Sequence, residues 1–189
     1  EQYKYWLNQL PKLPELEIDS DNDRLRVYRQ YVVRYIPYER LFFQWYLKTF
    51  NRVVQQVFHD WGKPDIIHAH NNWPAGLVGS RLSKTYSIPM LITEHSTSFD
   101  ELMVKNYWFR KEVEQASNDY HKIITVSPYL AECLKSFLDP QKIIVMGNVI
   151  AIDFFSFSLI EPDRNRSYFQ FLSIAYLSKQ KGISVLISA

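Results

Sequence analysis

The sequence predicts an α/β domain built on a parallel, doubly wound sheet, followed by the first elements of a second domain of the same class. Short apolar segments with strand character alternate along the chain with segments in which apolar residues recur every three or four positions. Near residue 156 a polar, proline-containing run interrupts this alternation. With 189 residues, 47% of them hydrophobic, the chain can bury a core.

The segment before the first helix contains one expected strand. Residues 1–23 are polar and contain two prolines, so no element is predicted there. Residues 24–35 alternate apolar and polar side chains, which is typical of an extended strand. Between Glu39 and Trp61 the apolar residues share one helical face, and Gly62 is expected to end that helix.

The alternating part of the chain contains four further strands and three helices. Strands are expected over residues 65–70, 88–93, 122–126 and 142–146, and helices over residues 73–86, 104–118 and 128–137. Because strands that alternate with helices pair in parallel, we expect one parallel sheet with helices packed against it.

A domain boundary is expected in a polar segment. Residues 156–167 lose all periodicity, which is typical of an interdomain linker. Residues 1–155 would form the first domain, and residues 168–189 would begin a second one, with a strand over 168–175 and a helix after Gly182. Because a domain does not end partway along its first helix, we expect the sequence to stop inside the second domain.

The glycines bear on the start of the first domain. A doubly wound domain normally opens with a strand, a glycine-rich turn that cradles phosphate, and a helix. The five glycines of this chain, at positions 62, 76, 79, 147 and 182, form no such cluster. We therefore expect the opening part of that domain to be missing.

Charge and cysteine content exclude several classes of protein. The formal net charge is only +2, from 22 basic and 20 acidic side chains, so no nucleic-acid partner is expected. Cys133 is the single cysteine, which rules out an intrachain disulfide and fits a reducing compartment. No signal peptide is recognisable, and no apolar run approaches the roughly 20 residues that a membrane-spanning helix needs. We expect a cytoplasmic location.

Five short motifs follow one another along the chain. They are 63–70 (KPDIIHAH), 88–95 (IPMLITEH), 123–127 (IITVS), 148–150 with 153–155 (NVI and DFF), and 181–182 (KG). In this order and spacing they resemble the family 4 retaining glycosyltransferases of the GT-B fold. The resemblance covers about residues 24–189. It implies two Rossmann-like domains that face each other across a cleft, with the acceptor bound by the first and the nucleotide sugar mainly by the second.

The chain departs from the family pattern in several places. The glycine-rich loop near the family's N-terminus is absent, and the acidic position common after the Asn-Val-Ile motif is Ala151. The paired glutamates of the family's donor motif would lie beyond Ala189. The resemblance implies that Lys181 contacts the donor diphosphate. The basic residue that usually helps it is Tyr176 here, so diphosphate binding would be weaker or helped from elsewhere.

His95 is the leading candidate for the reaction centre. It follows a buried strand, at the carboxyl edge where open α/β sheets bind ligands. The resemblance implies that it points into the cleft at the transferred sugar, where it binds a hydroxyl or gives electrostatic support. Ser96 and Thr97 beside it could donate hydrogen bonds to the same ligand. Without the resemblance, the simpler interpretation of His95 is a histidine that makes its hydrogen bonds to backbone groups at the strand end. Its two neighbours would then be interpreted as ordinary turn residues.

Two histidines lie in the strand expected over residues 65–70. His68 and His70 are two positions apart, so both project from one face and could begin a metal site. No third ligand at suitable spacing accompanies them, so no metal is expected. We expect His70, Asn71 and Asn72 to face the acceptor pocket. His68 is expected to be partly buried, and the alternative for Asn72 is capping of the following helix.

The resemblance implies a transferase in the full-length protein. A sugar would pass from a UDP- or GDP-sugar to a glycan or lipid-linked acceptor with retention at the anomeric carbon. The nucleotide sugar would be a substrate, with no further cofactor. Catalysis would rest on positioning and charge stabilisation, so no nucleophile is assigned. This chain alone is expected to be inactive, because it holds little of the donor domain.

Several alternatives stay open. One is a non-catalytic sugar-binding or scaffold domain. Another is a hydrolase in which Ser96 or Ser127 pairs with His95, although neither serine lies in a G-x-S-x-G turn. The helix over residues 39–61 also suits a membrane surface, which would make the protein peripheral on the inner membrane face. The side chains that suggest this are Arg40, Lys48, Arg52, Phe43, Trp45 and Leu47.

Overall fold

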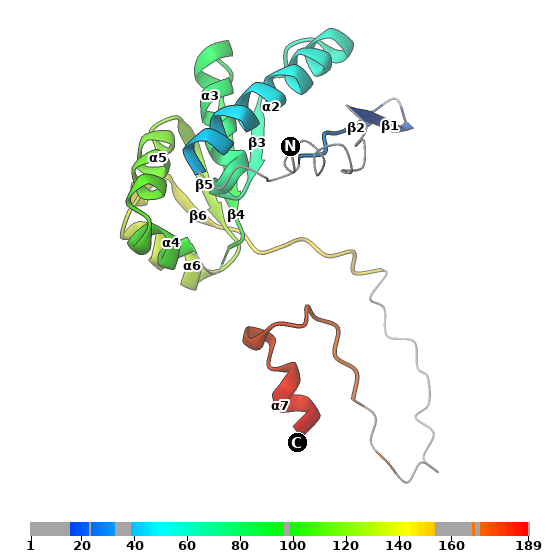
Figure 1. The fold of residues 1–189 in the computed structure, drawn as a ribbon, viewed down its shortest axis with the longest axis vertical. Helices are drawn as coiled ribbons and strands as arrows, with labels where there is room; N and C mark the ends of the chain where they lie inside the picture. The colour runs from blue at the N-terminus through cyan, green and yellow to red at the C-terminus, as the bar shows by residue number, and fades with distance from the viewer. Residues whose placement is uncertain are drawn as a thin grey trace, which may run out of the picture. The chain divides into compact units, whose positions relative to one another are not determined.

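The computed structural model describes residues 16–22, 24–32, 39–96, 99–153, 168 and 171–188. The chain divides into two compact units, Glu1–Val149 and Ile150–Ala189, which are separate bodies here. The first unit carries the sheet and all but one of the described α-helices, which are labelled in Figure 1.

Helix α2 (Glu39–Trp61) has the limits that the sequence predicts. Phe43 is 1% exposed, and Leu47 packs against the same core cluster from the next turn, which supports a core role for this helix over a membrane-surface role. Gly62 ends the helix with a φ of 81°, a backbone conformation that favours glycine. Neither α2 nor any other helix that the structure describes is long and apolar enough to cross a membrane.

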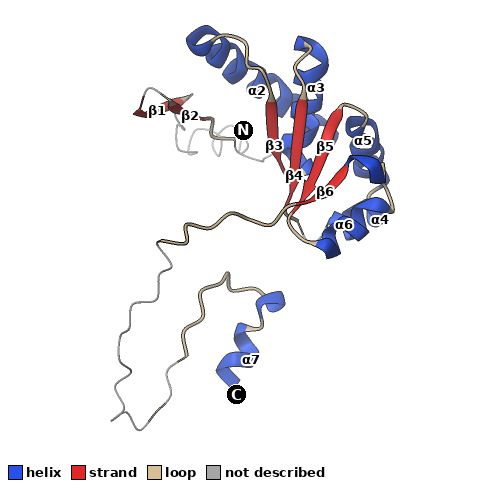
Figure 2. Ribbon diagram, turned by 180° about the vertical axis from the view of Figure 1, so that it is seen from behind, coloured by secondary structure: helices blue, strands red, loops and turns tan. Residues whose placement is uncertain are grey.

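The centre of the first unit is a four-stranded parallel sheet in the order β3-β4-β5-β6 (Figure 2). The strands are β3 (Ile67–His70), β4 (Met90–Glu94), β5 (Tyr120–Thr125) and β6 (Ile143–Val145). The connections contain a π-helical turn (Asn72–Gly76) and α3 (Leu77–Tyr86), then α4 (Phe99–Lys105) and α5 (Tyr107–Ser117), then α6 (Pro128–Lys135) and a 3-10 turn (Pro140–Lys142). Neighbouring parallel strands joined through helices confirm the predicted Rossmann-like α/β class.

The segment between β4 and β5 differs from the prediction, because the single helix expected over residues 104–118 is two helices. Asn106 leaves the helical conformation with φ −118° and ψ 95°, and its side-chain oxygen accepts a hydrogen bond from the N–H of Phe109 at 3.0 Å. Asparagine is a preferred N-cap because its oxygen satisfies an N–H that has no partner within the helix. This cap starts α5 directly after α4.

The N-terminal part of the described chain forms a hairpin of two antiparallel strands. β2 (Leu25–Arg29) lies within the strand predicted over residues 24–35, but residues 30–32 are not strand, and residues 33–35 lie outside the described part. Its partner, β1 (Glu17–Asn22), falls where no element was predicted. The sequence EIDSDN lacks the apolar alternation that would have indicated a strand.

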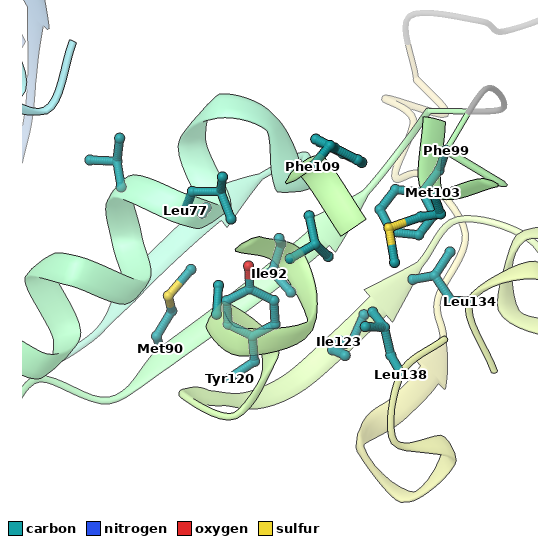
Figure 3. Packing of buried hydrophobic residues seen from close by; sticks show 14 of the residues in the cluster. Leu77, Met90, Ile92, Phe99, Met103, Phe109, Tyr120, Ile123, Leu134 and Leu138 are labelled. Atoms are coloured by element: carbon teal, nitrogen blue, oxygen red, sulfur yellow. The ribbon is translucent and has the colours of Figure 1, made fainter. Parts of the chain in front are cut away.

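One face of the sheet packs against the helices. Ala69, Ile92 and Ile123 share one register across three strands and are buried, and Figure 3 shows Ile92 and Ile123 among the core side chains. Helix α3 approaches β4 closely, since a Cβ added to Gly79 would lie 2.6 Å from Cε of Met90. These contacts pack α3 closely against β4 from the first residue of that strand.

The opposite face of the sheet is more open among the described residues. Successive side chains of a strand point to opposite faces, so His68 lies on the other side from Ala69, together with its register partners Leu91 and Lys122. His68 and Lys122 are exposed, and Leu91 is half-buried. The expectation that His68 is partly buried is therefore wrong, because it lies on this open face.

The described part of the second unit contains a turn and one short helix. A 3-10 turn (Lys179–Lys181) precedes Gly182, whose φ is 66°, and α7 (Ile183–Ser188) confirms the helix predicted there. The strand predicted over residues 168–175 is absent at the described residues of that range, where Phe171 is 79% exposed. A strand requires hydrogen bonds to a neighbouring strand, and no described segment pairs with this one.

Candidate functional site

The candidate site lies where β3 and β4 end. The two strands are neighbours in parallel register, with His70 opposite Thr93, so the residues that follow them emerge at the same edge. In open α/β sheets this carboxyl edge is where ligands bind. The sequence-predicted residues His70, Asn71, His95 and Ser96 meet here.

The side chains of His70 and His95 form a hydrogen-bonded pair. Nδ1 of His70 lies 2.9 Å from Nε2 of His95, and the two rings are stacked, with centroids 5.2 Å apart and planes inclined by 16°. One nitrogen must donate and the other must accept, so the contact holds one proton, and the tautomers decide which ring donates. When both rings are neutral they therefore take the same tautomer, both protonated on Nδ1 or both protonated on Nε2.

The surroundings of His70 favour its neutral form. Burial lowers the pKa of His70, and repulsion from the positive charges of protonated His68 and His95 lowers that pKa further. The His68 ring lies beside it, with centroids 4.6 Å apart, and Nε2 of His68 is 2.8 Å from Oγ1 of Thr93. Three imidazoles thus lie in a row at the strand ends, the middle one biased towards the uncharged state.

These histidines do not form a metal centre in the structure. Over the described ranges, no three His, Cys, Asp or Glu side chains are positioned to hold a metal ion. The facing nitrogens of His70 and His95 bond to each other instead.

Asn71 has an unusual backbone conformation at the end of β3. Its φ of 66° and ψ of 144° lie in a region that residues with a Cβ rarely adopt, at a cost of about 1–3 kcal/mol. Three hydrogen bonds hold it there. Its N–H donates to the Thr93 carbonyl at 2.8 Å, its carbonyl accepts from the N–H of Gly76 at 3.0 Å, and its Oδ1 accepts from the N–H of His95 at 3.1 Å. The strain is therefore located at a residue that joins the two strand ends.

Glu94 supports the site from beneath, with 1% of its surface exposed. Its Oε2 accepts from the backbone N–H and the side-chain Nδ2 of Asn72, at 2.8 and 2.7 Å. Its Oε1 accepts from the backbone N–H groups of His95 and Ser96, at 3.0 and 2.8 Å. Glu94 was not among the residues that the sequence predicts for the site. A glutamate that ends a buried apolar strand was the available signal, because a buried carboxylate needs hydrogen-bond donors.

Asn72 is buried next to Glu94, with 1% of its surface exposed. Its Nδ2 donates to Glu94, and its Oδ1 accepts from the hydroxyl of Tyr120 at 3.2 Å. Burial raises the pKa of Tyr120, and the negative charges of Glu94 and Asp119 raise it further, so that hydroxyl stays a donor. The structure thus has Asn72 inside the turn rather than facing a pocket, and its amide bonds to these two side chains rather than capping a helix.

The remaining predicted residues lie elsewhere. Thr97 lies outside the described residues. Lys181 and Tyr176 belong to the second unit, and both are exposed, Tyr176 to 88%. The hydroxyl of Ser127 accepts from the N–H of Leu130 at 3.2 Å and caps α6, which gives Ser127 a structural role and weakens the hydrolase alternative.

Comparison with known proteins agrees with this fold. The family model described as Glycosyltransferase Family 4 matches residues 11–154. An uncharacterised glycosyltransferase of Methanocaldococcus jannaschii is 27% identical over 191 residues, which cover 96% of this chain and 50% of the relative. The chain thus spans about half the length of the curated relative that it matches. Because the family model covers most of the chain, including both strand ends of the candidate site, the chain belongs to glycosyltransferase family 4.

Proposed function

We propose that the full-length protein transfers a sugar from a nucleotide-sugar donor to a glycan or lipid-linked acceptor with retention, and that the ends of β3 and β4 face the transferred sugar. The observation that carries this proposal is the His70–His95 pair, seated on a buried carboxylate at the ligand-binding edge of the sheet. Membership of the family supports the reaction class.

The proposed role of His95 is to hold a sugar hydroxyl. Its Nε2 is engaged by His70, which leaves Nδ1 to reach a substrate. Because the tautomer of His70 determines that of His95, the pair presents Nδ1 of His95 as either a donor or an acceptor, but not both. Such a preorganised polar group is worth about 10²–10³-fold in rate when it acts on the transition state.

The donor side of the proposal rests on Lys181, which ends the 3-10 turn and is exposed. Departure of a nucleoside diphosphate develops negative charge, and a cation held about 4 Å away contributes about 4 kcal/mol at an effective dielectric constant of about 20. Tyr176 would lie near the same diphosphate and bring no charge. The nucleotide is proposed to be UDP or GDP, and it enters as a substrate, with no additional cofactor.

A peripheral contact with the inner membrane face is a separate part of the proposal, relevant to a lipid-linked acceptor. The buried Phe43 and the core-packed Leu47 are not available for it, whereas Arg40, Lys48 and Arg52 of α2 are exposed. Such a contact would therefore be mainly electrostatic. Flotation with anionic liposomes tests it, and a protein that stays unbound at low salt would remove membrane contact from the proposal.

The experiment that tests the transferase proposal uses the full-length protein. Release of nucleoside diphosphate is measured with a panel of UDP- and GDP-sugars in the presence of glycan and lipid-linked acceptors. We expect His95→Ala to lower kcat about 10²-fold or more. His59→Ala is the matched control, because the His59 side chain is 82% exposed on α2 and is hydrogen-bonded to its neighbour Asp60, away from the candidate site. Wild-type turnover in His95→Ala would remove His95 from the mechanism, and donor binding without turnover would favour a non-catalytic sugar-binding domain.

A further inference from the structure

We propose that Glu94 is a positioning residue that holds His95 in place, and that only a carboxylate at position 94 can do so. This inference rests on the proposed function, because the value of a positioned His95 depends on its facing a substrate. Its first test needs no enzymatic activity.

The hydrogen bonds of Glu94 require four acceptor sites and no donor. Each carboxylate oxygen accepts two N–H groups, those of Asn72 on one side and those of His95 and Ser96 on the other. A glutamine of the same shape would turn its NH₂ group towards two N–H donors in either orientation of its amide. In one orientation the two buried N–H groups of Asn72 would lose the carboxylate as acceptor, and in the other the N–H groups of His95 and Ser96 would lose it, which is costly where a donor is shielded from water.

The hydrogen bonds of Glu94 link the loop that follows β3 to the loop that follows β4. The parallel ladder between β3 and β4 ends at the pair His70 and Thr93. Beyond it, Glu94 joins Asn72 of one loop to His95 of the other. The carboxylate therefore continues the connection between β3 and β4 past the end of their ladder.

Asn71 is a second residue that holds His95, and it allows the positioning role to be tested separately. The N–H of His95 is shared between Glu94 Oε1 and Asn71 Oδ1, at 3.0 and 3.1 Å. Asn71 makes this contact from a backbone conformation, φ 66° and ψ 144°, that glycine would adopt without strain. Asn71→Gly therefore relieves the backbone and removes one anchor of His95. A purely structural role predicts an equal or higher Tm for this variant and nothing else, whereas a positioning role also predicts a less ordered His95.

The test is made on this chain labelled with ¹⁵N. Long-range ¹H–¹⁵N spectra report the tautomer of each imidazole, and amide hydrogen exchange reports the N–H groups of His95 and Ser96. In the wild type we expect one and the same tautomer for His70 and His95, as their Nδ1–Nε2 hydrogen bond requires. In Glu94→Gln we expect averaged tautomer signals and at least a tenfold faster exchange at Ser96. Glu112→Gln is the matched control, because Glu112 pairs with Arg81 on the surface of the helices, 3.3 Å away.

Two outcomes decide the inference. In Asn71→Gly, an unchanged or raised Tm together with mixed His95 tautomers supports it, and this variant serves as the test if Glu94→Gln does not fold. Wild-type tautomers and wild-type exchange at Ser96 in a folded Glu94→Gln protein, or wild-type tautomers in Asn71→Gly, overturn it.

A second readout connects the inference to the reaction. In the full-length protein we expect Glu94→Gln to lower kcat at least tenfold with little change in the KM for the donor, since Glu94 itself would not contact the donor. An unchanged kcat in an active enzyme overturns the catalytic part. If the full-length protein transfers no sugar at all, the proposed function fails, while the spectra still decide whether Glu94 positions His95.

Discussion

The two units of the chain both contain residues proposed to contact the substrate, but they hold these residues differently. In the first unit, His95 follows a buried strand, and its backbone N–H is bonded to Asn71 and Glu94. In the second unit, Lys181 is exposed, and so are apolar side chains of the same unit, among them Ile174 at 89%. Packing within this chain therefore fixes the position of His95 and does not fix that of Lys181.

The comparison shows how a polar site depends on apolar burial. The hydrogen bonds around Glu94 require several groups to be held at separations near 3 Å, and the sheet and α3 hold them because Ile92 and Leu77 are packed beneath. The described residues of the second unit have no comparable layer. Substitutions in the two units should therefore have very different effects on the stability of this chain.

The largest expected difference concerns an apolar side chain in each unit. Ile92→Ala removes a fully buried side chain from the face of β4 that packs on α3, so we expect a loss of about 2–5 kcal/mol in the free energy of unfolding. Leu172→Ala changes a side chain that is 84% exposed, so we expect a change within about 0.5 kcal/mol. Urea unfolding followed by far-ultraviolet circular dichroism measures both, since the backbone of each unit contributes to that signal. Similar losses in the two variants would mean that the second unit is also packed in solution.

A smaller effect is expected at the glycine beneath the candidate site. A Cβ on Gly76 would lie 2.7 Å from Cδ1 of Ile92 and 2.9 Å from the Tyr120 hydroxyl. We expect Gly76→Ala to lower the free energy of unfolding by about 1–3 kcal/mol, because overpacking outweighs the better helix propensity of alanine. Gly147→Ala is the control, since nothing lies within 4 Å of its Cβ position, and its change should stay within about 0.5 kcal/mol. A Gly76→Ala protein as stable as the control would show that the turn can move away from β4.

Much of the fold could be predicted because its signals are local. The apolar face of α2 and Gly62 defined that helix to the residue, and the alternation of strands and helices defined the parallel sheet. The predictions failed where pairing with another strand determines whether a segment becomes a strand. The polar β1 becomes a strand only by pairing with β2, and the segment over residues 168–175 has strand character without a described strand to pair with.

The candidate site could be predicted in part for the same reason. His70 and His95 follow strands that the apolar pattern identifies, so their meeting at one sheet edge follows from the fold class. The burial of Asn72 and the four hydrogen bonds of Glu94 depend on the conformation of the turn at Asn71, which has φ 66°. Non-glycine residues rarely adopt that conformation, and no pattern in a single sequence predicts it.

The smallest expected effect is a pH dependence that only the first unit can produce through histidine, because all five histidines lie in that unit. The pKa of His70 is lower in the folded protein than in the unfolded chain, mainly through burial. The unfolded state therefore binds more protons as the pH falls below about 6.5, the ordinary value for histidine. Above that pH, His70 does not reduce the free energy of unfolding. As the pH is lowered from there towards the pKa of His70 in the folded protein, the free energy of unfolding should fall progressively. His70→Gln removes the titrating group, so its stability should decline less between pH 6.5 and about pH 5 than that of the wild type. Urea midpoints measured over this range test the prediction, and parallel curves for the two proteins would contradict it.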